Sequence, residues 1–313
     1  MRFSHRIASL AAAAVTVFAS TAFAAVVTTP VGVYTNTGSS NMGDTIAADA
    51  WLRVNVRNGG QVGISTTYPR NGDGSVFMSL GDNTNNNAKA DWEYYPTAGF
   101  GRLADLTALS YDWYRDAAST TGTNFHPVIR LFIDADGDST TTTDRGYLVF
   151  ERSYNPNVSP VPTNIWTSEN VTGATNLWWV QFGFGIEPVY NRTLSTYQAG
   201  TYTPSSISLL SFAQIGPNST ILGVSLGIGS GWNTGVSGGP AFLGAVDNVT
   251  LTSITSGAAS LSQTNFEVRL PVAVVPAAPV PTLNIASLLA LVALFVLGLG
   301  WFSRRRFGTG APR

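Results

Sequence analysis

The chain has 313 residues, no cysteine and only 11% charged residues. Six of its 17 basic residues lie in the two ends, whereas all 18 acidic residues lie between Asp44 and Glu267, so the central region carries a net charge of −7. This charge argues against nucleic acid and anionic lipid as partners, because both need clustered positive charge. The lack of cysteine excludes disulfides, thiolate catalysis and cysteine-bound zinc.

The N-terminal residues have the pattern of a secretory signal peptide. Arg2 and Arg6 give a basic start, and residues 7–19 are apolar but too short to span a bilayer. Ala22 and Ala24 are small residues at the positions that a signal peptidase reads. The sequence therefore predicts a signal peptide over residues 1–24, cleaved after Ala24, with the Sec translocon and signal peptidase as partners.

Residues 25–270 indicate an extracytoplasmic domain built of strands and turns. Alternating apolar and polar residues predict half-buried strands at 89–94 and 109–113. Denser apolar runs predict central strands at 128–133, 147–150, 177–184, 221–228 and 242–251. Glycine and asparagine mark the turns between them, and no amphipathic helix is expected before the C-terminal tail. We expect an all-β fold, an antiparallel β-sandwich of the jelly-roll kind.

The predicted strand at 89–94 carries a pair of carboxylates. Asp91 and Glu93 are two residues apart, so they project from one face at roughly 6 to 7 Å, within the range of glycosidase acid/base pairs. Trp92 and Tyr94 take the opposite face, which predicts that the carboxylates face solvent as a charged outer surface. A glycoside hydrolase is therefore only a second alternative, and no catalytic residue is expected.

An acidic loop follows the predicted strand at 128–133. Asp134, Asp136 and Asp138 alternate, and Asp144 comes a short loop later, an arrangement of oxygen ligands that suits a hard cation. The pattern is not an EF-hand, because glycine stands at its fourth position and Arg145 at its twelfth. The alternatives are a structural Ca²⁺ and a turn with solvated carboxylates.

Asp247 is a further candidate metal ligand. Alternation within residues 244–251 places it on the face of Val249 and Leu251, which is the core side of the predicted strand. A buried carboxylate needs a partner, and backbone amides, an arginine or Ca²⁺ would each supply one. This segment resembles the last strand of carbohydrate-binding jelly rolls, a resemblance that implies a structural aspartate, in some cases a Ca²⁺ ligand.

Three tryptophans are candidates for stacking against sugar rings. Trp178 and Trp179 are adjacent on a predicted strand, so they point to opposite faces. Trp232 lies on a glycine-rich loop. The alternative for each is a place in the core, where large aromatic residues of a sandwich usually lie. A carbohydrate-binding jelly-roll module, with exopolysaccharide as its partner, is thus the first alternative function.

A proline-rich stalk and an apolar tail end the chain. Four prolines within residues 271–281 predict an extended, semi-rigid stalk. Residues 283–302 are uncharged and apolar and would span about 30 Å as a helix, enough to cross a bilayer. Arg304, Arg305 and Arg306 follow, and such a basic cluster stays on the cytoplasmic side. The domain is therefore expected outside the cytoplasm, anchored in the inner membrane.

The motif Val280-Pro281-Thr282-Leu283, with the apolar run and the arginines, resembles the IPTL-CTERM sorting signal of Gram-negative envelope proteins, a relative of the PEP-CTERM signal. The likeness covers residues 280–307, with Val280 where the family usually has Ile and without the Trp-Gly that often follows the motif. It implies recognition of residues 280–283 by an exosortase-type protease. The alternative is a permanent anchor that no protease cleaves.

Taken together, the two ends and the central domain predict an exported, non-enzymatic protein of the cell surface or extracellular matrix. The central domain is similar to uncharacterised exported sandwich proteins with sorting tails, a resemblance that implies no activity. The one cofactor that the sequence suggests is the structural Ca²⁺.

Overall fold

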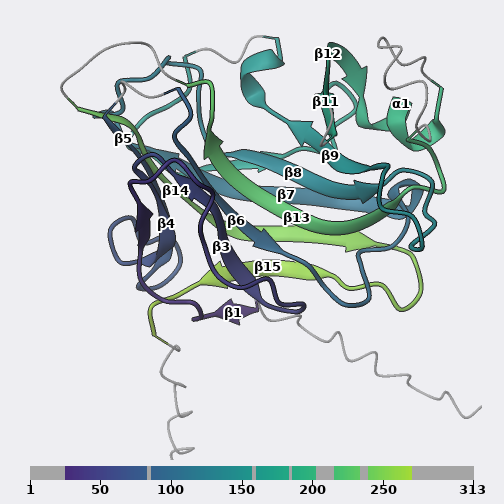
Figure 1. Ribbon diagram of the computed structural model, residues 1–313, viewed down its shortest axis with the longest axis horizontal. Coiled ribbons are helices and arrows are strands. Elements are labelled where there is room, and N and C mark those ends of the chain that lie inside the picture. The colour runs from purple at the N-terminus through teal and green to yellow at the C-terminus, as the bar shows by residue number, and fades with distance from the viewer. Residues whose placement is uncertain are drawn as a thin grey trace, which may run out of the picture. The chain divides into compact units, whose positions relative to one another are not determined.

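The computed structural model describes residues 25–82, 86–156, 160–182, 185–201, 215–232 and 239–269 (Figure 1). The predicted signal peptide, the stalk, the sorting motif and the basic cluster lie outside these residues. Within them, none of the helices has the length and apolar character that a membrane crossing requires.

The described residues are mostly β-strand. The strands are β1 (Val26–Val27), β2 (Tyr34–Asn36), β3 (Trp51–Arg57), β4 (Gly60–Ser65), β5 (Ser75–Asp82), β6 (Lys89–Tyr94), β7 (Leu106–Arg115), β8 (Val128–Asp134), β9 (Arg145–Phe150), β10 (Thr167–Asn170), β11 (Leu177–Phe182), β12 (Gly185–Thr193), β13 (Thr220–Gly229), β14 (Pro240–Ser253) and β15 (Leu261–Phe266). The short helices are α1 (Leu194–Ala199) and the 3₁₀ turns η1 (Leu103–Asp105) and η2 (Arg152–Tyr154). The predicted all-β fold is confirmed.

One sheet contains eight strands and is organised around β14. The path runs β1-β15-β14-β5-β4-β2, and β14 also pairs with β7, which pairs with β10. The first half of β14 pairs with β5 and the second half with β15, while β7 runs along the other edge. A strand of 14 residues can serve three neighbours in this way, because each contacts a different part of its length or a different edge.

The second sheet contains seven antiparallel strands in the order β12-β11-β9-β8-β13-β6-β3. These strands succeed one another across the molecule in Figure 1. The five runs predicted as central strands lie in β8, β9, β11, β13 and β14, so four of them belong to this sheet. The run predicted at 177–184 is observed as 177–182, and its last two residues lie outside those described.

The inner face of the seven-stranded sheet is apolar. The strand registers bring five side chains into one row across β6, β13, β8, β9 and β11, and each of them is at most 1% exposed: Trp92, Leu226, Ile129, Phe150 and Trp178. Phe266 of β15 meets Trp92 edge to face, with ring centroids 5.8 Å apart. The two sheets therefore pack through their apolar faces, as a sandwich requires.

A β-bulge in β3 changes which side chains reach the outer face. Asn55 has a φ of 53°, and the pairing with β6 shifts by one residue between Val54 and Arg57. Asparagine tolerates positive φ better than most residues do. Because one residue is inserted, Val56 turns into the core, where it is fully buried, and Arg57 pairs with Lys89 on the outer face.

Candidate functional site

The outer face of the seven-stranded sheet carries a second row of side chains, most of them polar, on the same five strands as the apolar row of the inner face. The same five strands place Glu93, Ser225, Arg130, Val149 and Trp179 side by side, each next in sequence to a member of the inner row. Asp91 lies in the next row of this face, opposite Gly227. Most of these side chains are buried, so this face differs from the solvated surface that alternation alone suggests.

Asp91 is the centre of a buried ion cluster. Its carboxylate accepts from Lys89 Nζ at 2.9 Å, from Arg130 Nη1 at 3.0 Å and from Asn55 Nδ2 at 2.9 Å. Burial opposes ionisation of Asp91, but the charges of Lys89 and Arg130 outweigh it and lower the pKa of this carboxyl. Asp91 is thus held as a carboxylate between two cations.

The glycines of β13 make room for this cluster. A Cβ placed on Gly227 would collide with Asp91 Oδ1 and Arg130 Nη1, so the pair of side chains crosses directly over the bare backbone of β13. Gly223 similarly leaves space for the ring of Tyr95. The alternation of glycine and serine along this face of β13 is therefore a consequence of what lies on top of it.

The two carboxyl oxygens of Glu93 differ in their hydrogen bonding. Its Oε2 accepts a hydrogen bond from the Tyr95 hydroxyl, whereas its buried Oε1 has no partner among the residues described. Burial raises the pKa of Glu93 and the Asp91 carboxylate raises it further, while the hydroxyls of Tyr95 and Ser225 and the charge of Arg130 oppose the rise. The prediction that Asp91 and Glu93 face solvent is wrong: they are 1% and 2% exposed. Alternation correctly identified their shared face, but it could not reveal the side chains and loops that cover it.

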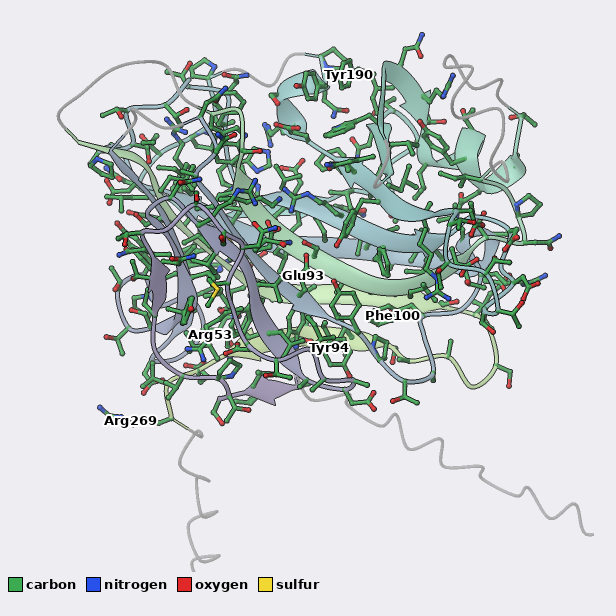
Figure 2. The ribbon with its side chains drawn as sticks, viewed as in Figure 1. Arg53, Glu93, Tyr94, Phe100, Tyr190 and Arg269 are labelled. Carbon is green, nitrogen blue, oxygen red and sulfur yellow. The ribbon has the colours of Figure 1, made fainter. Side chains whose placement is uncertain are left out.

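An aromatic pocket of about 250 Å³ opens beside this cluster. Its walls include aromatic side chains from η2, two strands and two loops: Phe125, Tyr154, Trp179, Tyr190 and Trp232. The rings of Tyr154 and Tyr190 stack with centroids 3.9 Å apart, and Trp179 stands nearly edge-on to Tyr154 at 6.4 Å. Figure 2 labels Tyr190, which lies on β12 at one edge of the sheet, and Glu93, which lies on β6 towards the opposite edge.

A polar pocket of about 240 Å³ adjoins the aromatic one. It is lined by Asn55, Arg57, Lys89, Asp91 and Glu93, among others. Four residues line both pockets: Lys89, Arg130, Gln181 and Ser230. The two pockets therefore adjoin on the outer face, and together, here called the hollow, they have an aromatic half and a charged half, the composition typical of ligand sites.

Glu151 lies in the aromatic half. Burial raises the pKa of this carboxyl, while Arg130 and the side chains of Ser153, Trp179 and Trp232 oppose the rise. Glu151 and Val149, a member of the outer row, both line this half of the hollow.

The three predicted stacking tryptophans have different places. Trp178 and Trp179 do point to opposite faces, as predicted, and Trp178 is fully buried against Phe150, so its prediction as a stacking platform is wrong. Trp179 is partly exposed and lines the aromatic pocket. Trp232 is 5% exposed and stacks on Phe125 at 5.0 Å, so it forms the pocket wall more than an open platform.

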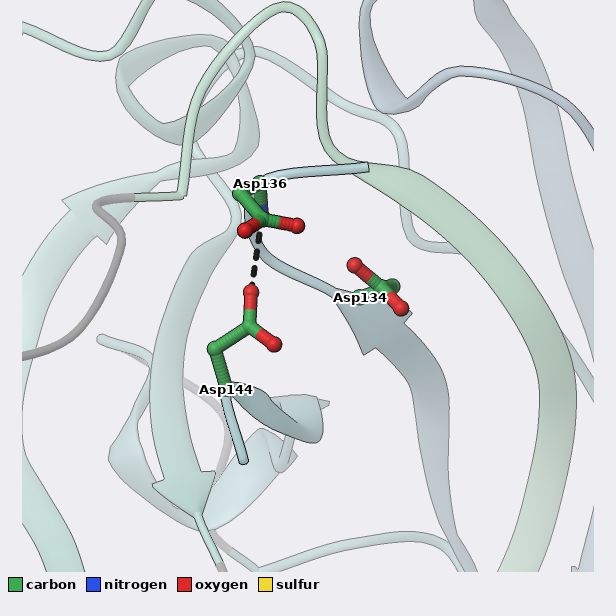
Figure 3. Close-up of side chains that lie close together, drawn as sticks. All are labelled: Asp134, Asp136 and Asp144. Atoms are coloured by element: carbon green, nitrogen blue, oxygen red, sulfur yellow. Dashed lines mark hydrogen bonds between the residues drawn. The ribbon is translucent and has the colours of Figure 1, made fainter. Parts of the chain in front are cut away.

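The acidic loop after β8 brings together three of the five predicted metal ligands. Asp134, Asp136 and Asp144 each place a carboxylate oxygen within 4.8 Å of the others (Figure 3). Asp138 is not in this group: its Oδ1 accepts from the amide and hydroxyl of Thr140. Three carboxylates at this spacing are compatible with a hard cation on distance alone.

Donors of the protein itself already occupy these carboxylates. Asp134 accepts from Arg145 Nε at 2.9 Å and from the Gly137 amide at 3.1 Å. Asp144 accepts from the Asp136 amide at 2.9 Å. Burial raises the pKa of Asp134, Arg145 opposes this, and Asp144 adds to it. A cation bound to Asp134 would share this carboxylate with Arg145 or displace it, so Ca²⁺ stays a prediction here.

Asp247 lies on the core side of β14, as predicted, and is 0% exposed. Its Oδ1 accepts from the amides of Asn248 at 2.8 Å and Phe266 at 3.0 Å, while Oδ2 has no partner among the described residues. Burial raises the pKa of Asp247 to about 7, and the nearby Glu267 and Asp112 contribute. The structure does not bring Asp247 into the group of three carboxylates after β8.

Comparison with known proteins gives no family for this chain. No protein-family model matches it, and no curated protein matches it significantly.

Several residues of the hollow were not predicted from the sequence. Arg130 stands inside an apolar strand, and Gly223, Ser225, Gly227 and Gly229 alternate along β13. Two signals in the sequence could have been read together. One is a charged residue inside an apolar strand, and the other is a series of glycines at every second position of another strand. Nothing comparable marks Tyr154 and Tyr190, because a 3₁₀ turn and a separate strand bring them together only in the fold.

Proposed function

We propose that this chain is an exported, non-enzymatic envelope protein whose jelly-roll-like sandwich binds polysaccharide in the hollow on the outer face of the seven-stranded sheet. The observation that carries the proposal is that an aromatic pocket adjoins a polar pocket lined by the buried ion cluster. Partly exposed Trp179 and Tyr190, with Tyr154 at 41% exposure, supply faces for stacking. Glu93, Gln181 and Arg130 supply hydrogen-bonding groups.

A carbohydrate fits this combination better than an apolar ligand does. Each sugar ring has a C–H face that packs on an aromatic ring and hydroxyl groups that exchange hydrogen bonds with side chains. The hollow provides both, and the Glu93 oxygen without a partner would gain one from a ligand hydroxyl. An apolar ligand would leave the ion cluster without compensation for the water it displaces.

Binding is tested by affinity electrophoresis against a panel of neutral and acidic polysaccharides. Replacement of Trp179 by Ala is expected to weaken retention of the bound polymer at least about tenfold, since stacking on this ring is lost. Trp166→Ala is the matched control, because Trp166 lies at Arg70 and Tyr114, outside the residues that line the hollow. Equal retention by both variants and the wild type would count against the proposal.

Export and sorting complete the proposal. The basic and apolar N-terminus, the acidic domain and the tail at residues 280–307 support a protein that crosses the inner membrane, is held there by residues 283–302, and is passed to the surface by an exosortase-type protease. Intact mass of the protein from its native host tests this. A chain ending near residues 280–283, with Pro281→Ala remaining full length in the inner membrane, is the expected result; a full-length wild type would leave only a permanent anchor.

A glycoside hydrolase is the second candidate, and one observation favours it. Asp91 and Glu93 have pKa values shifted in opposite directions, lowered and raised respectively, as in acid/base pairs. Two cations hold Asp91, however, which suits a structural carboxylate better than a nucleophile or base. Incubation of the protein with each bound polysaccharide should release no new reducing ends; release that disappears in Glu93→Gln would establish the hydrolase instead.

A further inference from the structure

The charged half of the hollow contains more cations than carboxylates to pair with them, and this bears on which polysaccharide binds. The inference rests on the proposed function above. Elsewhere in the described residues, ion pairs join one arginine to one carboxylate: Arg53 to Asp44, Arg70 to Asp112, Arg102 to Asp105, Arg145 to Asp134, Arg152 to Glu169 and Arg269 to Asp73. In the polar pocket, Lys89 and Arg130 share the single carboxylate of Asp91.

Arg57 adds a third cation to this pocket. The bulge at Asn55 turns Arg57 to the outer face beside Lys89, and its Nη1 donates to Asn41 Oδ1 at 2.6 Å. No carboxylate pairs with Arg57 among the described residues. A guanidinium with a neutral partner keeps donors and charge for a ligand, and its planar fork matches a carboxylate.

Two of the three cations that line the pocket are guanidinium groups. Burial, followed by the Arg130 charge, lowers the pKa of Lys89, and Asp91 opposes this. Arg57 and Arg130 remain charged at every pH at which a protein is folded. Three cations and two carboxyl groups line the pocket, and burial raises the pKa of one of these carboxyls, that of Glu93, so the pocket is locally basic although the domain as a whole is acidic.

The geometry points to an acidic polysaccharide: we propose that the polar pocket binds the carboxylate of a uronic-acid unit through Arg57, with Lys89 and Arg130 behind it, while neighbouring rings of the same polymer stack on Trp179 and Tyr190. Glu93 Oε1, which is buried without a partner, would hydrogen-bond a hydroxyl of the uronate. The acidic surface outside the hollow would repel every polyanion, including this one, so recognition depends on the pocket and not on a general attraction.

Affinity electrophoresis of the wild-type protein with two uronate polymers, polygalacturonate and alginate, tests this inference. Each polymer is compared with its carboxyl-reduced form, which has the same backbone without the charge. At least one acidic form is expected to bind about tenfold more tightly than its reduced form, a difference that shrinks as salt is added. In Arg57→Gln the affinity for the acidic form should fall to that of the reduced form, whose affinity should not change.

Arg102→Gln is the matched control, because Arg102 is exposed, pairs with Asp105 and does not line the hollow. Arg57 is only partly buried, and unchanged thermal unfolding of Arg57→Gln would show that its loss of binding is not a loss of folding. Equal affinity for acidic and reduced polymers, or binding to neutral polysaccharides alone, overturns this inference and leaves the proposed function standing. Binding to no polysaccharide at all overturns both.

Discussion

Two rows of side chains cross the same five strands of the seven-stranded sheet, one on its inner face and one on its outer face, and they differ in chemistry. The inner row, from Trp92 to Trp178, is entirely apolar and packs against the other sheet. The outer row, from Glu93 to Trp179, is largely polar yet also buried over most of its length. The side chains of the inner row are buried by the second sheet. Those of the outer row are buried within a polar layer in which charges pair with one another.

The two rows also differ in how much of their bonding capacity is used. The side chains of the inner row need only to pack together, because burial of apolar surface away from water stabilises the fold. The outer row needs each charge to find a partner, and it falls short at Glu93 Oε1, with Arg57 nearby in the polar pocket likewise lacking a carboxylate. We propose that a ligand completes the bonding at these positions.

The largest effect should come from the neighbouring tryptophans that end the two rows. Trp178→Ala is expected to lower the free energy of unfolding by about 4 kcal/mol, because it leaves a large cavity in the core. Trp179→Ala should lower it by about 1 kcal/mol, since that ring lines a pocket and leaves no closed cavity. Urea denaturation measures both. Equal losses would mean that the two faces are not packed differently.

Breaking the outer row's ion cluster should have the next largest effect. Arg130→Gln removes one of two cations from buried Asp91, and a loss of about 3 kcal/mol in the free energy of unfolding is expected. Arg102→Gln is the comparison, because Arg102 also pairs with an aspartate but is 54% exposed, and a much smaller loss is expected there. A loss for Arg130→Gln as small as that for Arg102→Gln would show that the outer face is solvated.

Asp247 extends the comparison to a carboxylate with a free oxygen outside the hollow. Its pKa of about 7 in the folded state lies above its ordinary value of 3.8, so the folded state alone binds a proton between these pH values. The contribution to stability is therefore present at low pH and is lost as pH rises towards 7. Asp247→Asn should raise the free energy of unfolding by about 2 kcal/mol at pH 8 and by much less at pH 4.

Denaturation of both proteins at the two pH values measures this difference. The Asn side chain retains an oxygen for the amides of Asn248 and Phe266, so the substitution tests the charge and not the hydrogen bonds. A variant less stable than the wild type at pH 8 would refute the assignment of a buried, strained charge at this position.

The smallest effect is expected at the acidic loop after β8. Its carboxylates accept hydrogen bonds from Arg145 and from loop amides, whereas Glu93 in the hollow keeps a free oxygen. Addition of EGTA should therefore lower the melting temperature of the wild type by no more than about 1 °C, a shift that corresponds to a small fraction of 1 kcal/mol. A drop of several degrees that Ca²⁺ reverses would instead support the predicted structural calcium.

Much of the seven-stranded sheet could be predicted from the sequence, because period-two alternation and β-branched runs are local properties. The strands at 89–94, 128–133 and 221–228 were found in this way, and so was the shared face of Asp91 and Glu93. The bulge at Asn55 could not be predicted, since a single positive φ leaves the pattern of apolar residues almost unchanged. Without it, Arg57 would point away from the polar pocket.

The sequence by itself determined the class of fold, the opposite orientation of Trp178 and Trp179, and the core position of Asp247. Each follows from alternation along one strand, which depends only on backbone geometry. The tertiary structure alone decided that Asp91 meets Arg130 across Gly227 and that Tyr154 reaches Tyr190. Those contacts depend on the order of strands in the sheet and on the path of loops over it, and residues far apart in the chain carry no local sign of either.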